Sequence, residues 1–360
     1  MAQSKRWKYD YVFLGVLSII IISGLVILYS TSSYNGKIKF GDTFYYLKKQ
    51  MFATLIGIAG MWMIANIDYH VWKRWAWAGY ILSVILGVAV LLFGDEYNGS
   101  KRWLSLGPFS FQPSEFAKVA VIVFLTNLII RNARKMGKIR TVGKIMLSTL
   151  PVVGLVGANN LSTAIIILGI AGGLVFVASP KYGQFVFMML LGITFMGVFL
   201  AMESYRLERL QIWRHPEKYE KGYQTLQGLY AIGSGGLFGN GLGKSIPKLG
   251  FVPEAQNDMI FSIICEEMGL VGAVFILILF LIVIWRFFVI AAHAPDLEGA
   301  LIATGAMTHM MIQVILNIAV VTNTIPNTGI TLPFISYGGT SVMFLLFEMG
   351  LVLSVSSLVK

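Results

Sequence analysis

Residues 258–290 read DMIFSIICEEMGLVGAVFILILFLIVIWRFFVI. Apart from carboxylates near its start and one arginine near its end, this run is apolar. It exceeds the roughly 20 residues that a helix needs to cross the hydrocarbon core of a bilayer. Because lipid offers the backbone no hydrogen bonds, such a run is expected to be helical. The sequence therefore predicts a membrane-spanning helix that begins at Asp258.

The composition extends this prediction to the whole chain. Of its 360 residues, 56% are hydrophobic and only 12% are charged, whereas soluble domains carry roughly 25% charged residues. We predict an all-α polytopic membrane protein with about ten transmembrane helices in a single domain, 1–360. The predicted spans cover residues 11–30, 50–67, 76–94, 115–131, 145–159, 161–179, 184–202, 258–290, 299–321 and 339–358.

The polar stretches set the expected orientation. They cover about 31–49, 95–114, 203–257 and 322–338, and all four fall on one side of the membrane. The 28 Lys and Arg residues divide about evenly between the two sides. However, the short basic segment 131–144 and the basic N-terminus are typical of cytoplasmic loops. We therefore expect both termini in the cytoplasm and the four polar stretches outside.

The largest of these stretches, about 203–257, forms the predicted extracytoplasmic loop between helices 7 and 8. It is rich in glycine, which permits sharp turns and close approach of the backbone to a neighbour. Its basic residues are Arg206, Arg209, Arg214, Lys218, Lys221, Lys244 and Lys248. Cations at a membrane surface suit a ligand with an anionic head and a lipid tail. The net charge is +11, and most of the basic residues lie in loops between the predicted spans, so anionic lipid is favoured over nucleic acid as a partner.

Asp258 has two interpretations. A carboxylate at the start of a helix can simply complement the helix dipole. Alternatively, it can act as a general base, because desolvation beside an apolar region favours proton uptake.

Glu115 and Lys118 lie three residues apart at the start of the fourth span and share a helix face. They are either a local ion pair with a snorkelling lysine or a charged pair lining a substrate cavity. Ser114 is predicted to cap this helix, after Pro113.

Polar residues also occur inside the predicted spans, where they are costly. Glu266, Glu267 and Glu348 suggest functional sites or buried pairs. His309, Gln313 and Asn317 recur every four residues, and hydrogen bonding between helices is the favoured interpretation. The single cysteine, Cys265, cannot form an internal disulfide, and no His or Cys residues have metal-ligand spacing.

Several motifs in one order resemble those of the SEDS family (shape, elongation, division and sporulation), which includes FtsW, RodA and SpoVE. The motifs are Lys101-Arg102-Trp103, Gln112 to Lys118, Tyr205 to Leu210, Gly222-Tyr223-Gln224, Ala231 to Gly239, Pro253 to Asp258, Glu266 to Gly269 and Leu332 to Gly339. Gly241 to Ser245 and the Tyr-Gln pair look closer to FtsW and SpoVE than to RodA. In one departure, Asn160 stands where the family usually has an acid.

The resemblance implies a peptidoglycan glycosyltransferase in the bacterial cell membrane that polymerises lipid II onto the nascent glycan strand. Asp258 matches the family's essential acid, and Glu115 and Lys118 match its charged pair. Expected partners are a class B penicillin-binding transpeptidase and other membrane proteins of the divisome or elongasome, in division, sporulation or elongation. We expect inversion with undecaprenyl pyrophosphate as leaving group, stabilised by cations. The candidates are Arg102, Lys118, Arg206, Arg209 and Lys244.

A divalent cation, Mg²⁺ or Mn²⁺, is a candidate cofactor with unknown ligands, and no organic cofactor is expected. The main alternative function is a lipid II flippase, and a third is a scaffold that recruits a transpeptidase.

Overall fold

The computed structural model describes residues 9–97, 100–106, 109–181, 183–186, 190, 192, 210–245 and 255–359. In this part of the chain, eight helices are long and apolar enough to cross a membrane. They are α1 (Tyr11–Phe40), α3 (Trp72–Phe93, with the 3₁₀ turn Tyr69–Val71 before it), α4 (Pro113–Arg131), α5 (Ile139–Asn159), α6 (Leu161–Ala178), α10 (Ile260–Ala292), α11 (Leu297–Val321) and α12 (Gly339–Ser356).

The remaining described elements are shorter or more polar. Helix α2 (Tyr45–Ala65) has Lys48 and Lys49 near its start, and α9 (Tyr223–Ser234) lies within the long polar loop. Further 3₁₀ turns cover Ala133–Lys135, Pro216–Lys218 and Glu220–Gly222. The polytopic all-α fold is confirmed. The predicted seventh span, 184–202, lies largely outside the described residues, so the count of ten spans stays a prediction.

One local prediction is wrong, and one local feature is not predicted from the sequence. Helix α4 begins at Pro113 with Gln112 as its N-cap, and no side chain caps it, so the predicted cap at Ser114 is wrong. Proline favours the first helical position, where its missing N–H is not needed. The polar stretch before α4 also forms a small antiparallel sheet in the order β1 (Asp95–Tyr97), β2 (Ser100–Leu106), β3 (Phe109–Phe111). This sheet carries Arg102 on its central strand.

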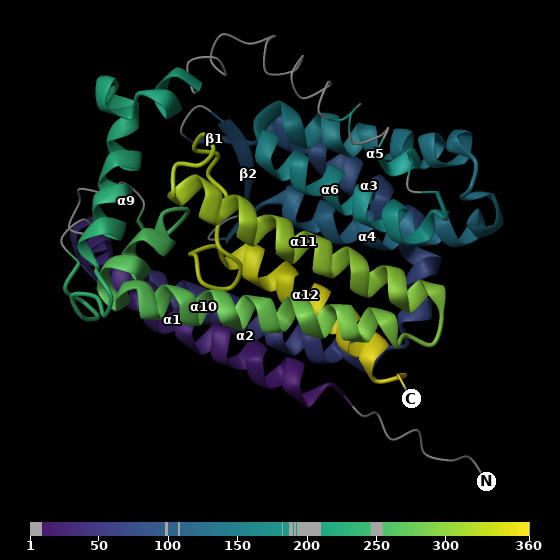
Figure 1. Cartoon of the computed structure of the whole chain (residues 1–360), viewed down its shortest axis with the longest axis horizontal. Coiled ribbons are helices and arrows are strands. Elements are labelled where there is room, and N and C mark those ends of the chain that lie inside the picture. Colours follow the sequence, from purple (N-terminus) through teal and green to yellow (C-terminus); the bar gives the residue numbers. More distant parts are fainter. Residues whose placement is uncertain are drawn as a thin grey trace.

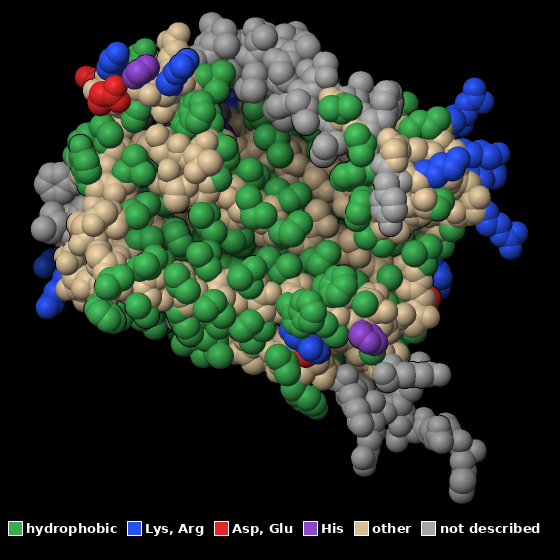
Figure 2. Space-filling view, in the orientation of Figure 1, with side chains coloured by type: hydrophobic (Ala, Val, Ile, Leu, Met, Phe, Trp, Pro, Cys, Tyr) green, Lys and Arg blue, Asp and Glu red, His purple; other side chains and the backbone are tan. Residues whose placement is uncertain are grey.

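Buried apolar side chains form two clusters that meet at α11. In Figure 1, α11 runs between α10 and α4. One cluster joins residues of α1, α2, α10 and α12, and the other joins α4, α5 and α6. Small residues allow close approach: a Cβ on Gly60 of α2 would lie 2.1 Å from the Phe347 ring of α12. Hydrophobic side chains cover the middle of the molecule, and charged side chains gather toward its ends (Figure 2). This distribution fits a membrane-embedded body.

The start of α1 and the end of α12 lie at the same end of the helix bundle, and the sheet and α9 lie toward the other (Figure 1). The described parts of the four polar stretches share that second end (Figure 1). We call it the loop end of the molecule.

Helix α10 is broken at Gly269, whose φ of 66° and ψ of −168° are not helical. The break leaves the Glu266 and Glu267 carbonyls without their usual partners, and they accept hydrogen bonds of 2.9 Å from the N–H groups of Asn240 and Gly241. The glycine-rich loop 235–245 thus replaces a turn of the helical ladder. A Cβ on Gly239 would lie 2.2 Å from the Glu267 carbonyl oxygen. Glycine at this position therefore lets the loop backbone pack closely against α10.

Candidate active site

Asp258 lies at the loop end, in the turn 255–259 that leads into α10, and is only 9% exposed. The turn is fastened to its surroundings: the Tyr337 N–H donates to the Gln256 carbonyl at 2.8 Å, and Asn317 Nδ2 donates to the Asp258 carbonyl at 2.9 Å. At the carboxylate itself, Gln224 Nε2 of α9 donates to Oδ1 at 3.4 Å. Three separate segments, α9, α11 and the α11–α12 loop, therefore position this one acid.

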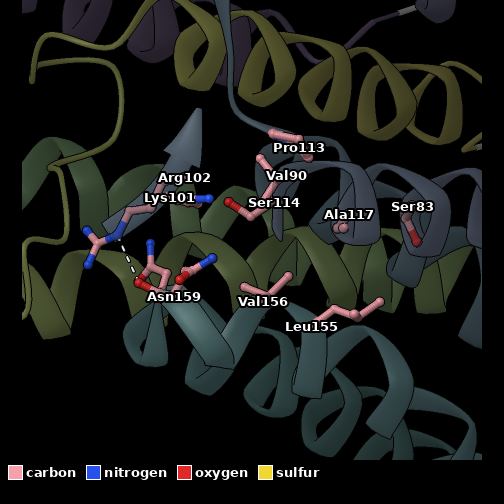
Figure 3. A pocket seen from close by; sticks show the side chains of 12 residues that line it. Ser83, Val90, Lys101, Arg102, Pro113, Ser114, Ala117, Leu155, Val156 and Asn159 are labelled. Carbon is pink, nitrogen blue, oxygen red and sulfur yellow. Dashed lines mark hydrogen bonds between the residues drawn. The ribbon is translucent and has the colours of Figure 1, made fainter. Parts of the chain in front are cut away.

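Arg102 brings a cation to the same place. It is half-buried on β2, and its Nε donates to the Asn159 carbonyl at the end of α5 at 3.0 Å (Figure 3). A Cβ on Gly329 would lie 3.7 Å from Arg102 Nη1 and 3.9 Å from Asp258 Oδ2. Gly329 is exposed and has a φ of 70°. The guanidinium and the carboxylate thus face a common space above a residue that has no side chain to fill it.

A pocket continues from Arg102 between α3, α4 and α5 (Figure 3). Its polar end contains Lys101, Arg102 and Asn159, and Leu155 and Val156 line its apolar wall. Its volume is about 20 Å³, which holds little more than one water molecule. In this conformation the pocket has no room for a lipid chain.

Glu115 and Lys118 form the ion pair that their spacing suggests, with 3.0 Å between Glu115 Oε1 and Lys118 Nζ. Both are buried, at 6% and 2% exposed, so the lysine does not snorkel. Lys118 Nζ also donates to Gln313 Oε1 at 3.2 Å. The geometry places both side chains within the protein. Their role in binding substrate stays a prediction.

The polar stripe on α11 forms the inter-helix bonds expected of it. His309 Nδ1 lies 2.7 Å from Glu348 Oε2 of α12, so Glu348 belongs to a buried pair. Gln313 contacts Lys118 of α4. Asn317 goes beyond this expectation, because it reaches the backbone of Asp258.

The other predicted cations are less informative. Lys244 is exposed on the glycine-rich loop, which packs against α10 about two turns beyond Asp258. Next to it, Ser245 donates to Glu266 and Ser30 of α1 donates to Glu267. The Gly243 N–H also donates to Ser30 Oγ at 3.0 Å, so the loop connects α1 to the break in α10. Arg206 and Arg209 lie outside the described residues.

Asn160, the departure from the family pattern, caps α6. Its Oδ1 accepts a hydrogen bond from the Thr163 N–H at 3.2 Å. Asparagine and aspartate cap helices about equally well. The exchange of an acid for an amide thus keeps this structural role and removes a charge.

Tyr337 lies on the α11–α12 loop beside the Asp258 turn. Burial, reinforced by Tyr45 and Tyr46, raises its pKa to about 12. Its phenol therefore stays protonated at neutral pH and cannot serve as a base.

Sequence reasoning missed three parts of this site. In the sequence, Gln224 stands out only as part of a motif and Asn317 only as part of a polar stripe. Nothing in the sequence marks Gly329. The one available signal was the amide at Asn317, since a buried polar group needs a partner.

A divalent cation at this site would need protein ligands. No group of three or more His, Cys, Asp or Glu that could hold a metal occurs among the residues that the structure describes. Asp258 has an amide and a guanidinium nearby. These residues do not form a protein-only cage.

The chain resembles known proteins over nearly its whole length. The FtsW/RodA/SpoVE family model, described as "Cell cycle protein", matches residues 10–360. Stage V sporulation protein E of Bacillus subtilis is 37% identical over 98% of each chain. The probable peptidoglycan glycosyltransferase FtsW of Geobacter sp. is 34% identical over 97% of each chain.

Two solved structures share the fold. A chain from "Structural coordination of polymerization and crosslinking by a peptidoglycan synthase complex" has a TM-score of 0.82 and 28% identity, covering 97% of both chains. The rod shape determining protein RodA of Thermus thermophilus has a TM-score of 0.71 and 27% identity, covering 98% of this chain and 97% of that one.

Proposed function

Because this chain belongs to the FtsW/RodA/SpoVE family of cell cycle proteins, we propose that it is a peptidoglycan glycosyltransferase that polymerises lipid II. A relative at 34% identity is named a probable peptidoglycan glycosyltransferase. The observation in this chain that supports it most is the shared space above Gly329, which a carboxylate and a guanidinium both face. A base beside an anion-stabilising cation is what glycosyl transfer from a pyrophosphate requires.

In the proposed reaction, the growing glycan on its lipid pyrophosphate is the donor and lipid II is the acceptor. Asp258 takes the proton from the 4-hydroxyl of the acceptor sugar as that oxygen attacks the donor's anomeric carbon. The bond from the anomeric carbon to the pyrophosphate oxygen breaks, and the pyrophosphate leaves with the bonding electrons. Attack opposite the leaving group inverts the anomeric configuration. Undecaprenyl pyrophosphate is the released product.

Arg102 stabilises the negative charge that develops on the pyrophosphate. Its anchor on the Asn159 carbonyl fixes Nε and leaves Nη1 toward Gly329. A cation that is held in place before the reaction stabilises the leaving group without reorganisation. Lys118, Lys244, Arg206 and Arg209 remain candidates for further contacts to substrate.

A Mg²⁺ or Mn²⁺ ion remains a proposal. Mg²⁺ is commonly held by one or two carboxylates together with substrate phosphates. Here Asp258 is the carboxylate beside the space above Gly329, so most of the ligands would have to come from the pyrophosphate.

We place the protein in the bacterial cell membrane with both termini in the cytoplasm and Asp258 outside. The position of both described chain ends at one end of the bundle supports this arrangement (Figure 1). A class B penicillin-binding transpeptidase is the proposed partner, alongside other divisome or elongasome membrane proteins. A structural neighbour belongs to a complex that coordinates polymerization and crosslinking.

The test is polymerisation of labelled lipid II by the purified full chain in detergent, with and without a class B transpeptidase. Detergent removes the two sides of the membrane, so a flippase makes no polymer while a polymerase makes glycan strands. A scaffold also makes none alone, and with the transpeptidase its product would not depend on Asp258. Glycan strands that this chain makes and that Asp258→Asn does not make support the proposal, and the absence of strands under both conditions contradicts it.

A further inference from the structure

The segment 328–331 of the α11–α12 loop, which we call the strap, contains Gly329 and has no regular secondary structure. Side chains from two helices hold its carbonyl groups. Ser162 Oγ of α6 donates to the Thr328 carbonyl at 3.2 Å, and Gln313 Nε2 of α11 donates to the Thr331 carbonyl at 3.1 Å. The position of the strap therefore depends on buried polar side chains around it.

Asn317 makes the remaining connection and joins the strap to Asp258. Its Nδ2 group donates to the Ile330 carbonyl at 2.6 Å and to the Asp258 carbonyl at 2.9 Å. The side chain is fully buried, at 0% exposed. One amide thus holds both the residue after Gly329 and the backbone of the proposed base.

These two hydrogen bonds leave the other polar atom of the amide unsatisfied. Both partners are acceptors, so the amide must point its NH₂ group toward them, and its Oδ1 is left buried without a partner within the described part of the chain. An unsatisfied buried acceptor destabilises the folded protein. A residue retained at such a cost calls for a further explanation, and the fixed geometry of Asp258 against the strap supplies one.

The strap also connects to the buried ion pair. Gln313 Oε1 accepts from Lys118 Nζ at 3.2 Å, while its Nε2 donates to Thr331. Lys118 is in turn paired with Glu115. The buried pair therefore reaches the strap through one amide group.

We infer that Asn317 is a positioning residue that holds Asp258 in register with the strap and thereby with Arg102, and that Gln313 transmits the position of Lys118 to the same strap. The inference rests on the proposed function. Asn317 is buried and does not contact substrate; it acts through the two backbone carbonyls. A misplacement of about 1 Å at a reacting group can lower the rate about 10²-fold.

The test compares Asn317→Ala and Asn317→Asp with the wild-type chain in the lipid II polymerisation assay. The control is Asn127→Ala, a buried amide of α4 whose Nδ2 donates to the Lys73 carbonyl instead. We expect kcat to fall about 10²-fold in Asn317→Ala with KM within about threefold of wild type. Asn317→Asp keeps the side-chain volume, and a protonated carboxyl holds only one of the two carbonyls, so a smaller loss in kcat is expected. Asn127→Ala should keep wild-type kcat.

A second readout does not need activity. Hydrogen exchange of peptides spanning 326–332 and 255–260 should be faster in both Asn317 variants and unchanged in Asn127→Ala. Unchanged exchange, a loss of kcat no larger than in the control, or a change confined to KM overturns the inference. If the wild type makes no polymer, the proposed function fails, while the exchange experiment still decides whether Asn317 holds the strap to Asp258.

Discussion

The acidic residues within the helix bundle and the acid at its loop end have different surroundings. Glu115 and Glu348 are buried against Lys118 and His309, at 3.0 and 2.7 Å. Asp258 is nearly as buried, but its carboxylate receives a long 3.4 Å bond from an amide and faces a guanidinium across Gly329. The two buried pairs hold helices together. The distinguishing feature of Asp258 is the space above Gly329 at its side, which an acid needs in order to take a proton from a substrate.

Removing the Arg102 guanidinium should have the largest effect on polymerisation among the changes considered at the two regions. In Arg102→Ala the departing pyrophosphate loses a fixed cation, and kcat for lipid II polymerisation should fall by about 10²–10³-fold. Arg134→Ala is the control, because Arg134 is exposed in the α4–α5 connection. Equal rates for the two variants would remove Arg102 from the reaction.

Breaking the buried pair should affect stability first. Lys118→Met leaves the Glu115 carboxylate uncompensated, at a cost of about 3–5 kcal/mol. The double variant Glu115→Gln/Lys118→Met removes both charges and should recover most of the loss. Thermal unfolding of the purified proteins in detergent measures both effects. A double variant no more stable than Lys118→Met would show that the pair is not the source of the loss.

The smallest effect is expected at the opposite end of the bundle. Asp296, which caps α11, accepts from the Gly299 N–H at 2.8 Å and contacts His70 and Tyr69. Burial acts to raise the pKa of Asp296, but these hydrogen bonds outweigh it and hold the pKa below its ordinary value. A lowered folded-state pKa stabilises the protein above the ordinary aspartate pKa of about 4, and this contribution is lost as the pH falls through the lowered value.

Asp296→Asn retains a capping oxygen and removes the charge. Its Tm should be about 1–3 °C below wild type at pH 7, with the difference shrinking toward pH 3. A difference that stays constant over this range would exclude the carboxylate charge as its cause.

The two regions also differ in how far the sequence predicts them. Apolar run length locates α10, α11 and α12 to within a few residues, because lipid forces such runs into helices. Asp258 is predictable from its place before an apolar run. The break at Gly269 is harder to predict, because the loop that completes the helical ladder begins more than thirty residues earlier in the chain.

The geometry around Asp258 could not be read from a single sequence. Gly329 and Arg102 are more than two hundred residues apart, and the position of a strap held by side chains depends on how α6 and α11 pack. The spacing of Glu115 and Lys118 predicts their ion pair. Their burial and the link through Gln313 follow from tertiary packing alone.

The most direct test of the central claim is the Asp258→Asn variant in the detergent polymerisation assay, with matched amounts of folded protein confirmed by thermal unfolding. The amide keeps the size of the side chain and cannot accept the proton from the 4-hydroxyl. We predict a fall in polymerisation of at least about 10²-fold with unchanged folding. Polymerisation within about threefold of wild type would contradict the account.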